Sequence, residues 1–218
     1  MRSFTRIAVA LSYLCASTVM AHPHVRVAYQ VDPVLDASGI RSLQVNWQLD
    51  AMTSAQIREN VDLNKNGVLD PDELQAFADG NHDLMKPSQF YLSLEQVDNP
   101  TPVPFEVTNY RATDAGFGFQ GGVHISFTVN LPASSSYSDI KVRFFDPTWY
   151  MAMQPRPGSG VATSNTACHS ELLSETRDTT LQGQQVLQFL FVQCAKGIEV
   201  RPTAQIFPAT EPANGDAL

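Results

Sequence analysis

The residues with the clearest capacity for chemistry lie in one twelve-residue stretch, 62–73. Oxygen-bearing residues occupy the positions that ligate calcium in EF-hand loops, where this hard cation takes six to eight oxygens. The expected ligands are side-chain oxygens and, at Val68, a backbone carbonyl: Asp62, Asn64, Asn66, Val68, Asp70 and Glu73. Gly67 permits the sharp turn between them. The pattern predicts a calcium site, with an Asx-rich surface turn as the alternative.

The residues around this loop favour the calcium interpretation. Helix-start patterns lie on both sides, at Thr53 with Gln56 and at Asp70 with Glu73, and an EF-hand needs a helix on each side of its loop. Two of the ligands are neutral asparagines, so we expect weak affinity, roughly 0.1–1 mM. The loop occurs once, which favours a structural ion over a calcium sensor.

A second metal site is expected at His22 and His24. Cleavage after Ala21 would make His22 the N-terminus, so that a free α-amine and two imidazoles lie close together. These nitrogens are ligands for zinc, copper and nickel. Pro23 has no amide proton to lose, which blocks the copper site that uses a deprotonated second-residue amide. The alternative is a solvated terminus, because two histidines alone do not form a site.

Further ligands for this site can be sought elsewhere in the sequence. His124 lies on the polar face of an expected strand and is the first candidate for a third ligand, followed by His82 and His169. Met151 and Met153 alternate on an expected strand and would favour Cu(I), with core packing as the alternative.

Two cysteines, Cys168 and Cys194, follow the expected cleavage site. In an oxidising compartment such a pair predicts a disulfide, because thiolate metal sites more often place cysteines two to four residues apart. A paired-thiolate metal site is the alternative.

The elements that position these residues are mainly strands. Alternating apolar residues predict strands at 25–31, 43–49, 90–97, 105–113, 123–131, 140–145, 185–193 and 198–201. Helices are expected at 53–61 and 70–80, and the turn residues of 36–39 predict a hairpin between the first two strands. The fold class is therefore mainly β, an antiparallel sandwich or two-sheet arrangement with one helix-loop-helix EF-hand-like insertion at 53–80.

The N-terminus predicts secretion. Arg2 and Arg6 precede a short apolar run, and small residues before His22 fit signal-peptide cleavage. We expect a signal peptide at 1–21, one β-rich domain at 22–207, a disordered tail at 208–218 and no transmembrane segment in the mature chain.

The net charge of −8 argues against nucleic acid as a partner and suits cations as ligands. No hydrolase motif is present, so we expect no enzymatic activity.

Three motifs carry a family resemblance: AHPHV at 21–25, DLNKNGVLDPDEL at 62–74 and FDPTWY at 145–150. Together they resemble an uncharacterised family of bacterial periplasmic proteins, described as the periplasmic component of an ABC-type transport system and often encoded beside nickel, cobalt or zinc permeases. The resemblance implies capture or delivery of a transition metal for an inner-membrane permease. At 151–153 the chain departs from the family pattern, because Met-Ala-Met replaces a more acidic stretch.

Three functions follow as hypotheses. The first is a periplasmic accessory protein for transition-metal transport, with zinc preferred over nickel or cobalt and calcium as a structural ion. The second is a copper protein or enzyme that uses an N-terminal histidine brace. The third is a calcium-stapled β module for adhesion or assembly.

Overall fold

The computed structural model describes residues 24–97, 101–116, 121–156, 167–179 and 183–195, with the backbone alone at 177–179 and 183–186. In chain order the elements are β1 (Val25–Asp36), β2 (Gly39–Leu49), α2 (Ala51–Val61), α3 (Pro71–Met85), the 3₁₀ helix η1 (Lys86–Tyr91), β3 (Leu92–Glu95), β4 (Glu106–Asp114), β5 (Val123–Asn130), β6 (Asp139–Phe144), β7 (Met151–Pro155), β8 (Cys168–Thr179) and β9 (Gly183–Cys194).

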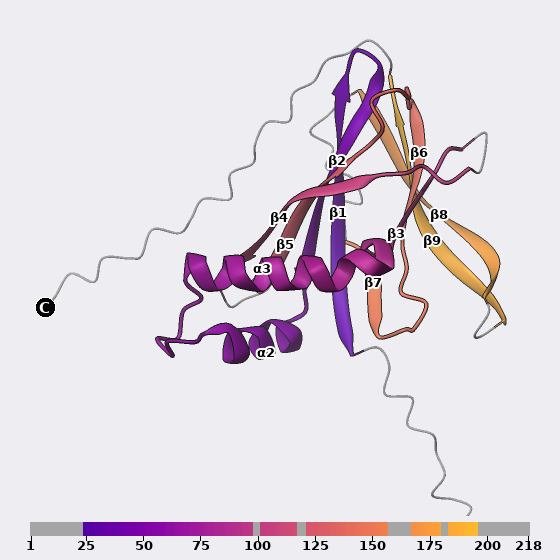
Figure 1. Cartoon of the computed structure of the whole chain (residues 1–218). Coiled ribbons are helices and arrows are strands. Elements are labelled where there is room, and N and C mark those ends of the chain that lie inside the picture. The colour runs from indigo at the N-terminus through magenta and orange to yellow at the C-terminus, as the bar shows by residue number, and fades with distance from the viewer. Residues whose placement is uncertain (1–23, 98–100, 117–120, 157–166, 180–182, 196–218) are drawn as a thin grey trace, which may run out of the picture.

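The strands form two sheets, with α2 and α3 running beside the β4–β5 side of the first (Figure 1). One sheet has the order β4-β5-β2-β1-β7 and the other β3-β6-β9-β8. Neighbouring strands are antiparallel except β1 and β7, which pair in parallel. The predicted fold class, mainly β with two sheets and few helices, is confirmed.

The hairpin of β1 and β2 forms where the turn residues predict it. Alternate residues of β1, such as Val27 and Tyr29, are buried, as period-two patterning requires. Asp36 accepts hydrogen bonds from the backbone N–H and the hydroxyl of Ser38 and so closes the turn. Gly39 has φ +126°, and a Cβ there would lie 2.3 Å from the carbonyl oxygen of Tyr137.

Aromatic rings join the two sheets in one core. Phe144 of β6 lies 4.7 Å from Tyr29 and 5.8 Å from Trp47, measured between ring centroids. Trp47 also meets Phe127 of β5 edge-on at 5.1 Å. Towards the helices the core continues through Tyr110, which stacks on Phe127 at 5.4 Å. Burial in this core raises the pKa of Tyr29 to about 12.

Both helices differ in extent from the prediction. α2 begins at Ala51, because the carboxylate of Asp50 accepts the N–H of Thr53 at 2.9 Å and caps the helix. The predicted cap at Thr53 is therefore wrong. α3 continues past Gly80 to Met85, and Asn81 in its later turns accepts the hydroxyl of Tyr110 on β4.

The strands differ from the prediction in two places. The expected strand 90–97 starts later, because Phe90 and Tyr91 belong to η1 and, like Gln89, have positive φ; β3 is only Leu92–Glu95. The sequence did not predict β8. The expected strand at 198–201, like the signal peptide at 1–21 and the tail at 208–218, lies outside the described residues.

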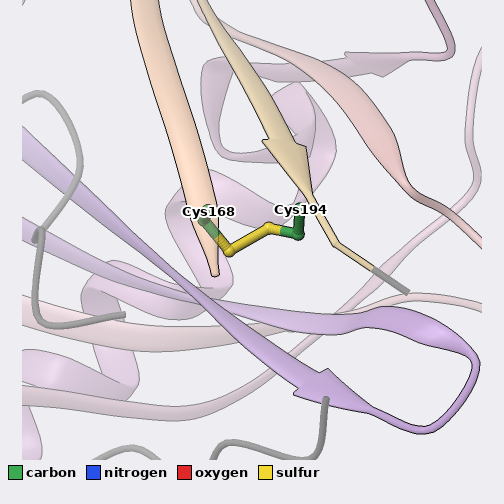
Figure 2. The surroundings of a disulfide bond; sticks show 2 residues. All are labelled: Cys168 and Cys194. Atoms are coloured by element: carbon green, nitrogen blue, oxygen red, sulfur yellow. A yellow bond between two sulfur atoms is a disulfide. The ribbon is translucent and has the colours of Figure 1, made fainter. Parts of the chain in front are cut away.

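The predicted disulfide is present. Cys168 and Cys194 face each other at the ends of β8 and β9 and are bonded, as Figure 2 shows. A disulfide is typical of a protein from an oxidising compartment. Within the described residues, no helix is long and apolar enough to cross a membrane.

Candidate functional site

Hydrogen bonds attach the helix pair that carries the predicted calcium loop to the first sheet at several points, two of which involve carboxylates. Asp50, the N-cap of α2, also accepts the N–H of Arg26 on β1 at 2.7 Å. Burial would raise the pKa of Asp50, but these N–H donors outweigh it and lower the pKa below its ordinary value. Further along α2, Arg58 binds the carboxylate of Asp114 on β4 through two nitrogens, at 2.7 and 2.5 Å.

The first half of the loop is folded around its own oxygens. Asp62 accepts the N–H groups of Asn66 at 3.1 Å and Gly67 at 2.8 Å. Asn66 in turn accepts the N–H of Val68 at 2.8 Å. Lys65 and Gly67 both have positive φ, 57° and 84°, and these two left-handed residues curl the backbone so that the side-chain oxygens lie inside the loop.

Glu73 closes the loop from the helix that follows. Its side chain is buried, and its carboxylate accepts the N–H groups of Leu63 at 2.8 Å, Asn64 at 3.3 Å and Asp70 at 3.0 Å. The last of these bonds belongs to the capping box that the sequence predicts at the start of α3. The two ends of the loop are thus joined through a single carboxylate.

Three predicted ligands meet at the centre of the loop. The side-chain amides of Asn64 and Asn66 donate to the same carboxylate oxygen of Asp70, at 2.8 and 3.1 Å. To bind calcium, the two amides would turn their oxygens inward, because calcium takes oxygen ligands. Within the described ranges, no three side chains drawn from His, Cys, Asp and Glu gather closely enough to hold a metal ion. A calcium site here depends on the two asparagines and on the carbonyl of Val68, and it stays a prediction.

His24 lies at the start of β1, beside the end of the FDPTWY motif. Its backbone N–H donates to the carbonyl of Tyr150 at 2.9 Å, and the two rings lie 5.2 Å apart. The parallel pairing of β1 with β7 continues this contact from Val25 and Met151 onward. Two of the motifs that carry the family resemblance therefore meet in space, although about 120 residues separate them in the sequence. His22 lies outside the described residues.

His124 does not join His24. It pairs across β5 and β2 with Gln48, which pairs with Ala28 of β1. His24 therefore lies two strands away and four residues along, a separation of about 10 Å across the sheet and about 13 Å along it. His82 is also apart, packed against Phe90 and Tyr110 with ring centroids 5.4 Å away in both cases. The exposed His169 lies beside the disulfide.

The sequence interpretation did not recognise the role of Asp146. This residue is 2% exposed, and one carboxylate oxygen accepts the N–H and the hydroxyl of Thr148, at 2.8 and 2.7 Å. The other accepts the N–H of Met151 at 2.9 Å. Asp followed two residues later by Thr is a pattern typical of an Asx turn, and this signal was available from the sequence. Asp146 thereby shapes the loop that leads into β7.

One comparison with known proteins gives a match. The model of a protein family described as being of unknown function matches residues 7–191, which is most of the chain. A search of curated proteins gives no match. The family's description carries no statement about transport, metals or cellular location.

Proposed function

Because this chain belongs to DUF1007, a family of proteins of unknown function, we infer its role from its own residues and propose that it is a periplasmic metal-binding protein. It captures a transition metal, zinc before nickel or cobalt, and presents it to an inner-membrane permease. Calcium in the 62–73 loop is a structural ion that holds α2 and α3 together. The disulfide, the signal-peptide pattern and the negative net charge support this location and this class of ligand.

The position of His24 is the observation that carries the transition-metal part. Its side chain is exposed, and hydrogen bonds from His24 and Val25 to the carbonyl of Tyr150 fix its backbone. A histidine on a fixed strand end loses less conformational freedom on binding than one on a free tail. His22 and the α-amine released by cleavage would complete the nitrogen donors. Together they form a compact site that a permease could reach from solution.

Zinc calorimetry on the mature chain beginning at His22 tests this part. We expect the double variant His22→Ala/His24→Ala to bind zinc at least about tenfold more weakly, because it loses both imidazoles. His169→Ala, which removes another exposed histidine, is the matched control and should bind like the wild type. Equal zinc affinity in all three proteins would remove the chemical basis of the transport proposal.

Calcium binding is tested separately through Glu73. The Glu73→Gln substitution replaces a carboxylate that accepts the N–H groups of Leu63, Asn64 and Asp70 by a neutral amide, which is a weaker acceptor. It therefore also lowers the stability of the fold in the absence of calcium. The informative quantity is therefore the rise in melting temperature on adding millimolar calcium. We expect a rise in the wild type and in Glu59→Gln, an exposed control on α2, and none in Glu73→Gln. A rise that survives Glu73→Gln would disprove the loop assignment.

A further inference from the structure

A small pocket lies where β7, at the edge of the first sheet, faces β9 of the second. Its lining differs in chemistry from the nitrogen and oxygen ligands of the two sites proposed above. Its volume is about 270 Å³. Aromatic rings and thioethers dominate its lining, with one carboxylate: Phe145, Asp146, Trp149, Met151 and Met153, together with Gln188. Met153 and Trp149 are half-buried, so the pocket can be reached from solvent. Among the described residues, His24 is not part of its lining.

The wall of this pocket is held in a strained conformation. Trp149 has φ 62°, a left-handed backbone that a bulky side chain rarely adopts and that costs about 1–3 kcal/mol. The bonds that Asp146 accepts from Thr148 and Met151 hold the loop in this shape. As a result the indole stands edge-on to Phe145, with centroids 5.6 Å apart and planes at 85°. Strained backbone of this kind clusters at active sites, ligand-binding sites and switch regions.

Two thioethers face the pocket from one strand. Met151 and Met153 pair in register with Val25 and Val27 of β1, so they lie on the same side of β7. The chain has six methionines, and four follow the expected cleavage site. Two of those four line this pocket. Methionine often fills irregular gaps in cores, and Met151 is itself 8% exposed and part of the core cluster, but both side chains also line this pocket together with Trp149.

The pocket's charge also favours a cation. Among the described residues that line it, Asp146 is the charged one. Burial, together with the negative charge of Asp146, raises the pKa of the neighbouring Tyr91. Thioethers are soft donors that select Cu(I) over zinc, and an indole face attracts a cation through its quadrupole. We propose that the pocket binds one Cu(I) ion through the sulfurs of Met151 and Met153, with Trp149 covering it. Binding involves no electron transfer, because the ion arrives already reduced.

Competition with bicinchoninate, a coloured Cu(I) chelator, tests this proposal. The titration is carried out without oxygen, with ascorbate, in the His22→Ala/His24→Ala background, which removes the imidazoles of the zinc proposal. A thiol assay verifies that the disulfide stays intact, so that cysteine sulfur does not contribute. We expect the background protein to take Cu(I) from the chelator with quenching of tryptophan fluorescence. Adding Met151→Leu and Met153→Leu should weaken binding by about tenfold or more.

A matched control uses the other two methionines of the mature chain. Met52→Leu/Met85→Leu in the same background should leave Cu(I) affinity unchanged. Equal affinity in both double variants would overturn the proposal, as would tryptophan quenching by tetramethylammonium but not by Cu(I), which would identify an organic-cation pocket. If the Met151→Leu/Met153→Leu protein fails to fold, X-ray absorption on the copper-loaded background protein decides instead. Sulfur neighbours around copper support the site, and nitrogen and oxygen neighbours alone overturn it.

Zinc affinity separates this proposal from the preceding one. Zinc prefers nitrogen and thiolate donors, so the methionine variants in the otherwise wild-type mature chain should keep its zinc affinity. The zinc site can therefore fail while the Cu(I) site stands, and the reverse is equally measurable.

Discussion

At the scale of single residues, Gly122 determines how closely α2 approaches the first sheet. It has φ +120°, and a Cβ there would lie 2.9 Å from the hydroxyl of Ser54 and 3.0 Å from the carbonyl oxygen of Leu49. Ser54 is fully buried, and its hydroxyl accepts the N–H of Val123 at 2.9 Å. A side chain at 122 would push the first turn of α2 away from β5.

We expect Gly122→Ala to lower the free energy of unfolding by about 1–3 kcal/mol, because it combines backbone strain with a steric clash. Urea unfolding followed by circular dichroism measures this change. Gly80→Ala is the control: Gly80 lies within α3, with no atom within 4 Å of an added Cβ. There alanine should stabilise the protein by about 0.5–1 kcal/mol. Equal effects at the two glycines would contradict this account.

Local residue patterns allowed part of the site to be predicted. The capping box at Asp70 and Glu73 and the turn at 36–39 depend on neighbours in the chain, and both are present. The left-handed backbone of Trp149 was not predicted, because the Asx-turn pattern at Asp146 and Thr148 indicates a turn but does not specify the conformation of Trp149. The contact of His24 with Tyr150 depends on a parallel pairing between distant segments, and no periodicity in either segment reveals it.

At the scale of elements, α2 is fixed to β4 by one ion pair. Arg58 contacts both carboxylate oxygens of Asp114 and also donates to the carbonyl of Gly116 at 2.7 Å. Burial would raise the pKa of Asp114, but the hydrogen bonds from Arg58 and from the N–H of Gly116 outweigh it. They lower the pKa below its ordinary value of 3.8. The carboxylate is therefore more acidic in the folded protein than in the unfolded chain.

This difference predicts a pH dependence. A lowered folded pKa gives stability that is present above pH 3.8 and is lost as the pH falls through the lower folded value. We expect Asp114→Asn to lower the free energy of unfolding by about 1–3 kcal/mol at pH 7 and to approach the wild type below pH 3.8. Urea unfolding across this pH range measures the difference.

Asp50, whose pKa is also lowered, contributes pH dependence to both proteins and cancels in the comparison. Glu59→Gln, an exposed change on the same helix, is the control and should parallel the wild type at every pH. A constant gap between Asp114→Asn and the wild type down to the lowest pH would show that Asp114 acts by packing alone.

Elements were predictable where the signal is local. The β1–β2 hairpin, β5, β6 and β9 follow from apolar alternation, because buried residues recur along each strand. β4 was also predicted, although Tyr110 is the one buried residue in it. β8 was missed because its described side chains are half-buried or exposed, without a clear apolar face. The strand predicted at 90–97 is longer than the observed strand, because Pro87 starts a 3₁₀ turn and three residues at positive φ follow it.

At the scale of the whole molecule, the two sheets share one aromatic centre. Phe144 is 5% exposed and contacts Tyr29 and Trp47 of the opposite sheet. The core that these rings form continues without interruption to Ala78 of α3 and Phe90 of η1. A continuous core of this kind favours a single cooperative unit, which is also what the sequence predicts for residues 22–207.

We therefore expect Phe144→Ala to cost about 3–5 kcal/mol, a large fraction of the 5–15 kcal/mol that is typical of a folded domain. The loss should appear as one shifted transition, because removing the ring creates a cavity that both sheets border. Urea unfolding is followed by tryptophan fluorescence, which reports on Trp47 and Trp149, and by circular dichroism, which reports on both sheets. Phe191→Ala, a half-buried ring on β9 outside the core cluster, is the control and should cost clearly less.

Coincident unfolding midpoints by fluorescence and circular dichroism support one domain. If the two midpoints separate in Phe144→Ala, the two sheets unfold independently.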